Sequence, residues 1–213
     1  LTVLSNGSSI RTLISRGGIE NVFGNALTAT ISSGGLQNIF SGASAVSASL
    51  IAGGIQNVSG GSVIATNIGE AAKGGGIQNI SSGGIAIRAT VSSGGLQNVF
   101  AGGSAVSATL IRSGIQNVSG GSATLTLIRP GGIQNISSGG IDTAATVSTG
   151  GVQNIYSSGF ASGATLSGGS QMISAGGTAN RTTVSAGGNQ IINGGAIVND
   201  ALLLSGGTQT LLT

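Results

Sequence analysis

Cysteine and histidine are absent from this 213-residue sequence, which also has one proline, no tryptophan and only 5% charged residues. Without cysteine there is no disulfide framework and no thiolate chemistry. Without cysteine and histidine, neither an ordinary nucleophile–base pair nor a transition-metal site can be assembled. Aromatic residues make up 2% of the chain, so any core must be narrow and aliphatic.

Acidic residues are too sparse for the chemistry of most carbohydrate-cleaving enzymes. That chemistry needs two carboxyl groups about 5 to 9.5 Å apart. The four acids, Glu20, Glu70, Asp142 and Asp200, are far apart in the sequence. The Gly-Gly-x-Gly-x-Asp motif of calcium-binding β-rolls is also missing. We therefore expect no catalytic residues, no metal and no cofactor.

The sequence pI of about 10.7 depends on only seven basic and four acidic groups. The basic residues are scattered, with no stripe and few aromatic side chains on which bases could stack, so we expect no nucleic-acid partner. No run of 18 or more apolar residues is present, so the sequence predicts no membrane-spanning helix.

Glycine is abundant, with 42 residues, and much of it belongs to a repeated phrase such as Gly94-Gly95-Leu96-Gln97-Asn98-Val99. The Gln position of this phrase recurs about every 19 residues, at Thr2, Glu20, Gln37, Gln56, Gln78, Gln97, Gln116, Gln134, Gln153, Gln171, Gln190 and Gln209. Such a period is typical of a solenoid, and it is too short for two packed helices, which need about 33 residues. Short Val, Ile and Thr runs between glycine pairs indicate strands and corners.

These observations predict an all-β fold, a single right-handed parallel β-helix of about 11 to 12 turns that occupies residues 1–213 as one repeat domain. Each turn of about 19 residues should contain a first strand, a glycine corner, a second extended stretch and another corner. A single turn buries too few aliphatic side chains to offset its ordering entropy, so neighbouring turns are obligatory. Both ends resemble interrupted turns, so we expect the chain to be an excerpt of a longer solenoid without its caps.

Alternation along strands assigns the columns that face inward. One column is aliphatic at every turn: Leu4, Val22, Ile39, Val58, Ile80, Val99, Val118, Ile136, Ile155, Ile173, Ile192 and Leu211. A second runs from Ile14 to Leu203 and is preceded two residues earlier by Ala or Thr. Parity also places the Gln column inside. Stacked Gln side chains could bond to one another as a ladder, or each could bond to corner backbone, and both roles are structural.

The opposite face of the first strand carries alternating aliphatic and Asn columns, which we expect to be exposed. An exposed apolar stripe that extends over about eight turns usually contacts a partner, although a flanking element could instead cover it. The candidate self-association face comprises Ile55, Asn57, Ile77, Asn79, Leu96, Asn98, Ile115, Asn117, Ile133 and Asn135. One 22-residue interval also contains the segment 69–74, a small charged insertion at one corner.

Two segments, residues 84–99 and 177–190, resemble the roughly 19-residue repeats of self-associating autotransporters of Gram-negative bacteria, of the diffuse-adherence adhesin type. Their Gly-Gly-x-Gln-x-Val and Ala-x-x-Thr-Thr-Val phrases carry the resemblance, which covers nearly the whole chain. It implies a secreted passenger, held at the outer membrane by a C-terminal β-barrel outside this sequence. It also implies adhesion to host cells, association with copies on other cells, and biofilm growth.

The same resemblance implies that a dedicated glycosyltransferase attaches heptose to Ser and Thr. Corner hydroxyls would be the acceptors: Ser32, Ser33, Ser81, Ser82, Ser92, Ser93, Ser137, Ser138, Ser148 and Thr149. The leading hypothesis is thus a glycosylated surface adhesin. A structural spacer that carries another domain is the alternative, and a polysaccharide-acting β-helix enzyme is disfavoured by the scarcity of acids.

Overall fold

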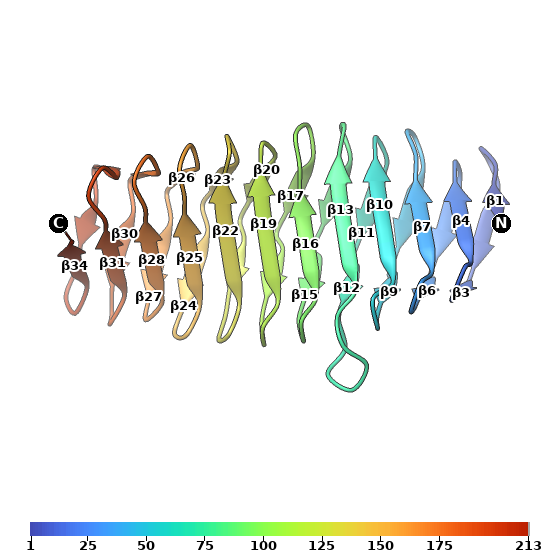
Figure 1. The fold of residues 1–213 in the computed structure, drawn as a ribbon, viewed down its shortest axis with the longest axis horizontal. Helices are drawn as coiled ribbons and strands as arrows, with labels where there is room; N and C mark the ends of the chain where they lie inside the picture. Colours follow the sequence, from blue (N-terminus) through green and yellow to red (C-terminus); the bar gives the residue numbers. More distant parts are fainter. Residues whose placement is uncertain (213) are drawn as a thin grey trace.

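The computed structural model describes residues 1–212, which form one rod of stacked coils (Figure 1). All strand pairings between successive turns are parallel, and each strand pairs with the strand one turn away along the chain. No helix occurs among these residues, and so none that could cross a membrane. The predicted β-solenoid with a spacing of about 19 residues is confirmed.

The strands form three sheets, one on each side of the coil. Sheet A has twelve strands: β1 (Thr2–Val3), β4 (Ile19–Val22), β7 (Leu36–Ile39), β10 (Ile55–Ser59), β13 (Ile77–Ser81), β16 (Leu96–Val99), β19 (Ile115–Ser119), β22 (Ile133–Ser137), β25 (Val152–Ile155), β28 (Ser170–Ile173), β31 (Asn189–Ile192) and β34 (Thr208–Leu211). Sheet B has eleven: β2 (Ser8–Ile10), β5 (Asn25–Leu27), β8 (Ser44–Val46), β11 (Ser62–Ile64), β14 (Ile85–Ile87), β17 (Ser104–Val106), β20 (Ser122–Thr124), β23 (Ile141–Thr143), β26 (Phe160–Ser162), β29 (Thr178–Asn180) and β32 (Ile197–Asn199). Sheet C also has eleven: β3 (Leu13–Ile14), β6 (Thr30–Ile31), β9 (Ser49–Leu50), β12 (Asn67–Ile68), β15 (Thr90–Val91), β18 (Thr109–Leu110), β21 (Leu127–Ile128), β24 (Thr146–Ser148), β27 (Thr165–Ser167), β30 (Thr183–Ser185) and β33 (Leu202–Leu203).

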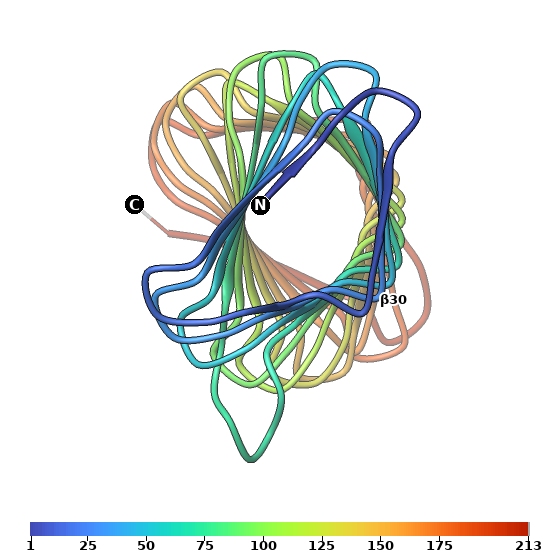
Figure 2. The same cartoon turned by 90° about the vertical axis from the view of Figure 1, so that its right-hand side faces the viewer.

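The coil has three sides, whereas the sequence predicted two extended stretches per turn; the end-on view in Figure 2 shows the three-sided outline. The second stretch is divided into a sheet B and a sheet C strand by one residue in the left-handed region. Its φ lies between 52° and 69° at each turn, and the position holds Arg11, Thr28, Ser47, Ala65, Arg88, Ser107, Leu125, Ala144, Gly163, Arg181 and Asp200. Only one of these residues is glycine, so the residue types gave no signal of the bend.

The core consists of aliphatic columns from the three sheets. The two columns predicted to face inward are buried over most of their length, from Val22 to Ile173 in sheet A and from Ile14 to Val184 in sheet C. Leu203 and Leu211 stay exposed at the last described turn. Sheet B contributes mostly alanine, which keeps the coil narrow.

The prediction for the first turn was wrong by one residue. Val3, not Leu4, pairs with Val22, and Leu4 is 70% exposed. The first turn has no Gln, so the sequence offered no recurring residue by which to align its strand with the strand of the second turn.

Corners between sheets C and A explain the paired glycines. At the corner before β16, Ser93 and Gly94 both have positive φ (50° and 76°), as a type I′ turn requires. The next residue, Gly95, lies so close to the preceding turn that a Cβ would sit 2.1 Å from the Ile68 carbonyl oxygen. The first glycine therefore serves the turn conformation and the second serves the stacking of turns.

Candidate adhesion surface

The outer face of sheet A carries the predicted self-association residues side by side. Register pairs Ile55 with Ile77 and Asn57 with Asn79, and the pairing continues turn by turn to Ile133 and Asn135. We expected these side chains to be exposed, but they are half-buried. Each one lies against its neighbours in the turns on either side, which cover part of its surface. The structure thus brings all ten residues into one two-column face, which twists along the rod (Figure 2).

The Asn column is a hydrogen-bonded ladder. Each Asn Nδ2 donates to the Oδ1 of the Asn one turn earlier at 2.9 to 3.1 Å, from Asn38 to Asn154. The ladder ends where Met172 takes the next position, and the Oδ1 of Asn154 has no hydrogen-bond partner. Each ladder bond uses one of the two amide hydrogens, so the other is available at the surface.

A second ladder runs inside the rod and decides between the two alternatives for the Gln column. Each buried Gln Nε2 donates to the Oε1 of the Gln one turn earlier at 2.6 to 2.8 Å, from Gln56 to Gln190, and Gln209 continues the ladder at the end of the rod. The amides therefore bond to one another and not to corner backbone. Parallel strands in register place identical side chains about 4.8 Å apart, which suits such a ladder.

Two of the four carboxyl groups are hydrogen-bonded to this ladder in the interior; the sequence placed Glu20 in the Gln column, but it did not predict the inward position of Asp142. Glu20 takes the Gln position at the start, where its Oε2 accepts from Gln37 Nε2 at 2.7 Å. Asp142 projects inward from sheet B, where its two oxygens accept from Gln134 at 2.8 Å and Gln153 at 3.1 Å. Both side chains have no exposed area. A signal for Asp142 existed: at a spacing of 19 residues it coincides with Ala123 and Ala161, which belong to a small-residue column.

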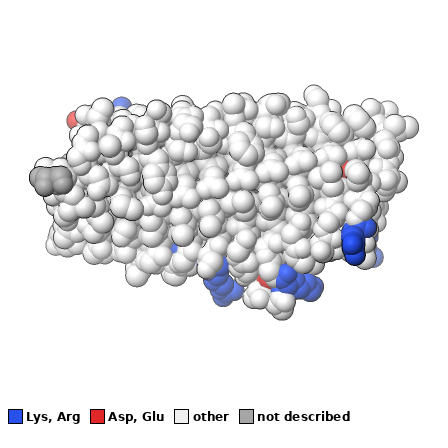
Figure 3. Space-filling model, in the orientation of Figure 1, with Lys and Arg blue, Asp and Glu red and all other residues white. Residues whose placement is uncertain are grey.

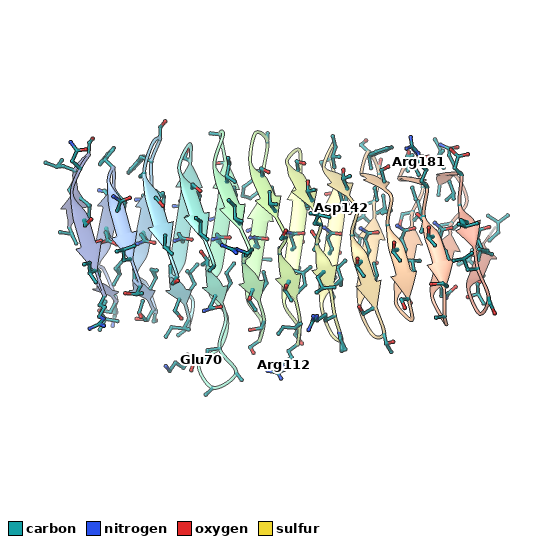
Figure 4. All side chains as sticks on the ribbon, turned by 180° about the vertical axis from the view of Figure 1, so that it is seen from behind. Glu70, Arg112, Asp142 and Arg181 are labelled. Carbon is teal, nitrogen blue, oxygen red and sulfur yellow. The ribbon has the colours of Figure 1, made fainter. Side chains whose placement is uncertain are left out.

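Burial raises the pKa of the Asp142 carboxyl from its ordinary 3.8 to about 6, because desolvation penalises the charged form. Hydrogen bonds from Gln134, Gln153, the Ala145 backbone and Thr126 oppose this shift and lower the pKa. Figure 4 shows Asp142 among the strands, whereas Glu70 and Arg112 project together at the edge that carries the insertion.

Seven of the ten predicted acceptor hydroxyls lie at corners: Ser82 and Ser138 between sheets A and B, and Ser32, Ser33, Ser92, Ser93 and Thr149 between sheets C and A. The other three, Ser81, Ser137 and Ser148, are not corner residues as expected, because they are the last residues of β13, β22 and β24. In each pair the first residue is half-buried, and the second is exposed at four of the five corners, namely Ser33, Ser82, Ser138 and Thr149. Ser93 is half-buried, and the Ser92 hydroxyl donates to the Gly69 carbonyl oxygen at 3.0 Å.

The insertion is a small closed loop at the corner between β12 and β13, as predicted. Glu70 and Gly74 bond to each other through their backbones, and Lys73 forms an ion pair with Glu70 at 3.1 Å. Both charged side chains are more than half exposed, so the pair adds little stability.

Charged side chains are confined to the edges of the rod and to the interior. The sequence suggested scattered cations, but four of the seven, Arg16, Lys73, Arg112 and Arg129, lie at corners between sheets C and A. The face of sheet A is almost entirely free of charge (Figure 3). Residues 1–212 contain no pocket and no group of three or more potential metal-ligating side chains.

Comparison with solved structures found a close structural neighbour. The crystal structure described as a "TibC-catalyzed hyper-glycosylated TibA55-350 fragment" superposes with a TM-score of 0.90 and 36% identity. The alignment covers 100% of this chain and 84% of that one. QnrB1, a plasmid-mediated fluoroquinolone resistance protein, aligns with a TM-score of 0.31 and 14% identity, too low to relate the two folds. No family model and no curated protein sequence matches the chain.

Proposed function

The chain belongs to the self-associating autotransporter adhesins, and on that premise we propose that it is a surface-exposed passenger segment that joins cells through the outer face of sheet A. The observation that carries the proposal is the uncharged, two-column face over eight Asn-bearing turns. Cell–cell aggregation, biofilm growth and attachment to host cells would follow from contact at this face.

Two copies of such a face complement each other. The aliphatic column offers apolar area, and burial of apolar area drives association at roughly 25 cal/mol per Å². Each ladder Asn keeps one amide hydrogen for a partner. The Asn side chains recur at a regular spacing of about 4.8 Å, so the Asn ladder of one rod has the same spacing as the ladder of a second copy.

The test is the settling of cells or beads that display this chain. Ile77→Lys with Ile115→Lys places two cations on the sheet A face, where they would repel a second copy and should slow settling at least severalfold. The matched control, Thr124→Lys with Thr143→Lys, adds the same charge to the outer face of sheet B and should settle like the parent. Equal settling of both variants would contradict the proposed face.

Glycosylation is the second part of the proposal, supported by the hyper-glycosylated state of the structural neighbour. A protein glycosyltransferase would reach the exposed corner hydroxyls, above all Ser33, Ser82, Ser138 and Thr149. Intact mass measured on protein from its native host should show sugar increments. Replacing these four residues with Ala should reduce the increments, whereas Ser92→Ala should not, since that hydroxyl is hydrogen-bonded.

A spacer role is the remaining alternative, because a uniform rod without a pocket could simply extend another domain from the cell. The two functions differ in outcome. A spacer predicts that cells displaying the parent chain settle no faster than cells without it, and the adhesin predicts that they clump.

A further inference from the structure

Asp142 occupies a column that is otherwise small and uncharged. In register with it, the inner face of sheet B holds Ser9, Ala26, Ala45, Val63, Ala86, Ala105, Ala123, Ala161, Ala179 and Val198. None of these side chains is hydrogen-bonded to sheet A. In this column only Asp142 connects sheet B to sheet A through side-chain hydrogen bonds.

The link joins two consecutive amides of the Gln ladder. Gln134 Nε2 donates to Gln116 Oε1 and to Asp142 Oδ1, both at 2.8 Å, and also lies 3.2 Å from the Thr126 hydroxyl, which accepts from it. Gln153 Nε2 donates to Gln134 at 2.7 Å and to Asp142 Oδ2 at 3.1 Å. Elsewhere in the described ladder each Nε2 has a single acceptor, the side chain one turn earlier. The carboxyl group therefore accepts an additional hydrogen bond from each of two ladder amides.

No charge compensates this carboxyl group. The groups that face it are the amides of Gln134 and Gln153, the Thr126 hydroxyl, the Ala145 backbone and the methyl groups of Ala123 and Ala161. The other buried carboxyl group, that of Glu20, lies six turns earlier along the ladder. The hydrogen bonds that these groups donate favour the charged form, but desolvation is the larger effect, so burial without a cation favours the neutral acid.

From this geometry we infer that Asp142 is a buried proton-binding site that couples the stability of the rod to external pH, so that mild acid strengthens the structure. Protonation removes the desolvation penalty and leaves one oxygen free to accept from a ladder amide. This pH dependence of stability does not depend on the adhesive function, and a rod that served only as a spacer would show it as well.

The direction of the effect follows from linkage. The folded pKa, about 6, lies above the ordinary 3.8, so the folded state binds more protons than the unfolded state between these values. The contribution of Asp142 to stability is then fully present below pH 4, is lost as the pH rises from 4 to 6, and does not change further above pH 6. The shift of about two units predicts a change of roughly a hundredfold in the folding equilibrium constant across that window.

The experiment compares denaturant unfolding at pH 4.5 and pH 7.5 for the parent, Asp142→Asn and Asp142→Ala. The parent should unfold at higher denaturant in acid, and both variants should lose most of that difference, since neither side chain titrates. Asp200→Asn, an exposed carboxyl at a sheet B to sheet C bend, is the control and should keep the pH response of the parent.

A direct titration of the Asp142 carboxyl by carbon NMR keeps the inference testable if a variant fails to fold. An apparent pKa near 6 supports the proton site. An apparent pKa near 4, or a pH response that Asp142→Asn leaves intact, overturns it.

Discussion

Removing a single Gln amide from the inner ladder should cost more free energy of unfolding than removing an amide from the surface, because its hydrogen-bond partners are buried. Gln97 is fully buried, donates to Gln78 at 2.7 Å and accepts from Gln116 at 2.6 Å. Asn98, the next residue, makes equivalent bonds on the outer face, where water can replace them. The same chemical group therefore has different consequences on the two sides of one strand.

We expect Gln97→Ala to destabilise the rod by about 2 to 4 kcal/mol, because it leaves a cavity, one buried donor and one buried acceptor without partners. Asn98→Ala should cost about 1 kcal/mol or less, since solvent reaches its partners. Denaturant midpoints of the two variants measure the difference. Equal losses would show that the inner ladder has no special energetic role.

The two glycines of one corner should also differ. Gly95→Ala places a methyl group against the Ile68 carbonyl, so the turns must separate locally, and we expect a loss of about 3 kcal/mol. Gly94→Ala meets open space and carries only the strain of a positive φ, about 1 to 2 kcal/mol. Thermal unfolding of both variants tests this order, and a larger loss for Gly94→Ala would contradict it.

At the scale of strands and corners, the sequence was most informative for sheet A. The recurrence of Gln with an aliphatic residue two positions later placed Gln97 and Val99 inside, and both are buried. It could not separate sheet B from sheet C, because the residues at the bend, such as Ser47, Ala65 and Arg88, share a backbone conformation but no chemistry. The alternation of side chains along the strand also could not decide which groups the Gln amides bond to. A neighbouring Gln and the backbone of a corner can both satisfy the hydrogen bonding of a buried amide.

The insertion is an element that the rod should tolerate losing. Eight residues separate β12 from β13, whereas four separate β15 from β16. Replacing residues 69–76 with the sequence Ser-Ser-Gly-Gly of the later corner should change the free energy of unfolding by less than about 1 kcal/mol, because loop closure depends weakly on length. Circular dichroism and the unfolding midpoint provide the measurement, and a collapse of either would assign the loop a structural role.

At the scale of the whole molecule, charge is segregated from the adhesive face. Arg16, Lys73, Arg112 and Arg129 lie along one edge, and the outer columns of sheet A are uncharged. Over twelve strands at about 4.8 Å, this neutral face extends for roughly 50 Å. Contact between two such faces depends on apolar area and amides, and little on ions.

Aggregation through this face should therefore be insensitive to salt. Raising the ionic strength from about 0.01 M to about 1 M shortens the Debye length from about 30 Å to about 3 Å, which weakens charge-driven contacts. Settling of displaying cells should change by less than about twofold across that range, as measured by turbidity. Dispersal of the clumps at high salt would assign the contact to the cationic edge.

The internal ladder has a direction, since every described Gln amide donates toward the start of the chain. Glu20 suits the first ladder position because its Oε2 accepts from Gln37 and no ladder amide precedes it in the turn before. At any later turn a carboxylate would place its oxygen against the carbonyl of the preceding side chain. Hydrolysis of one ladder Gln consumes a water molecule, releases ammonia and leaves Glu, so it would make that replacement and break the hydrogen-bonded column. Because the Gln side chains from Gln37 to Gln190 are fully buried, water has little access to them, and the fold protects the ladder against this reaction.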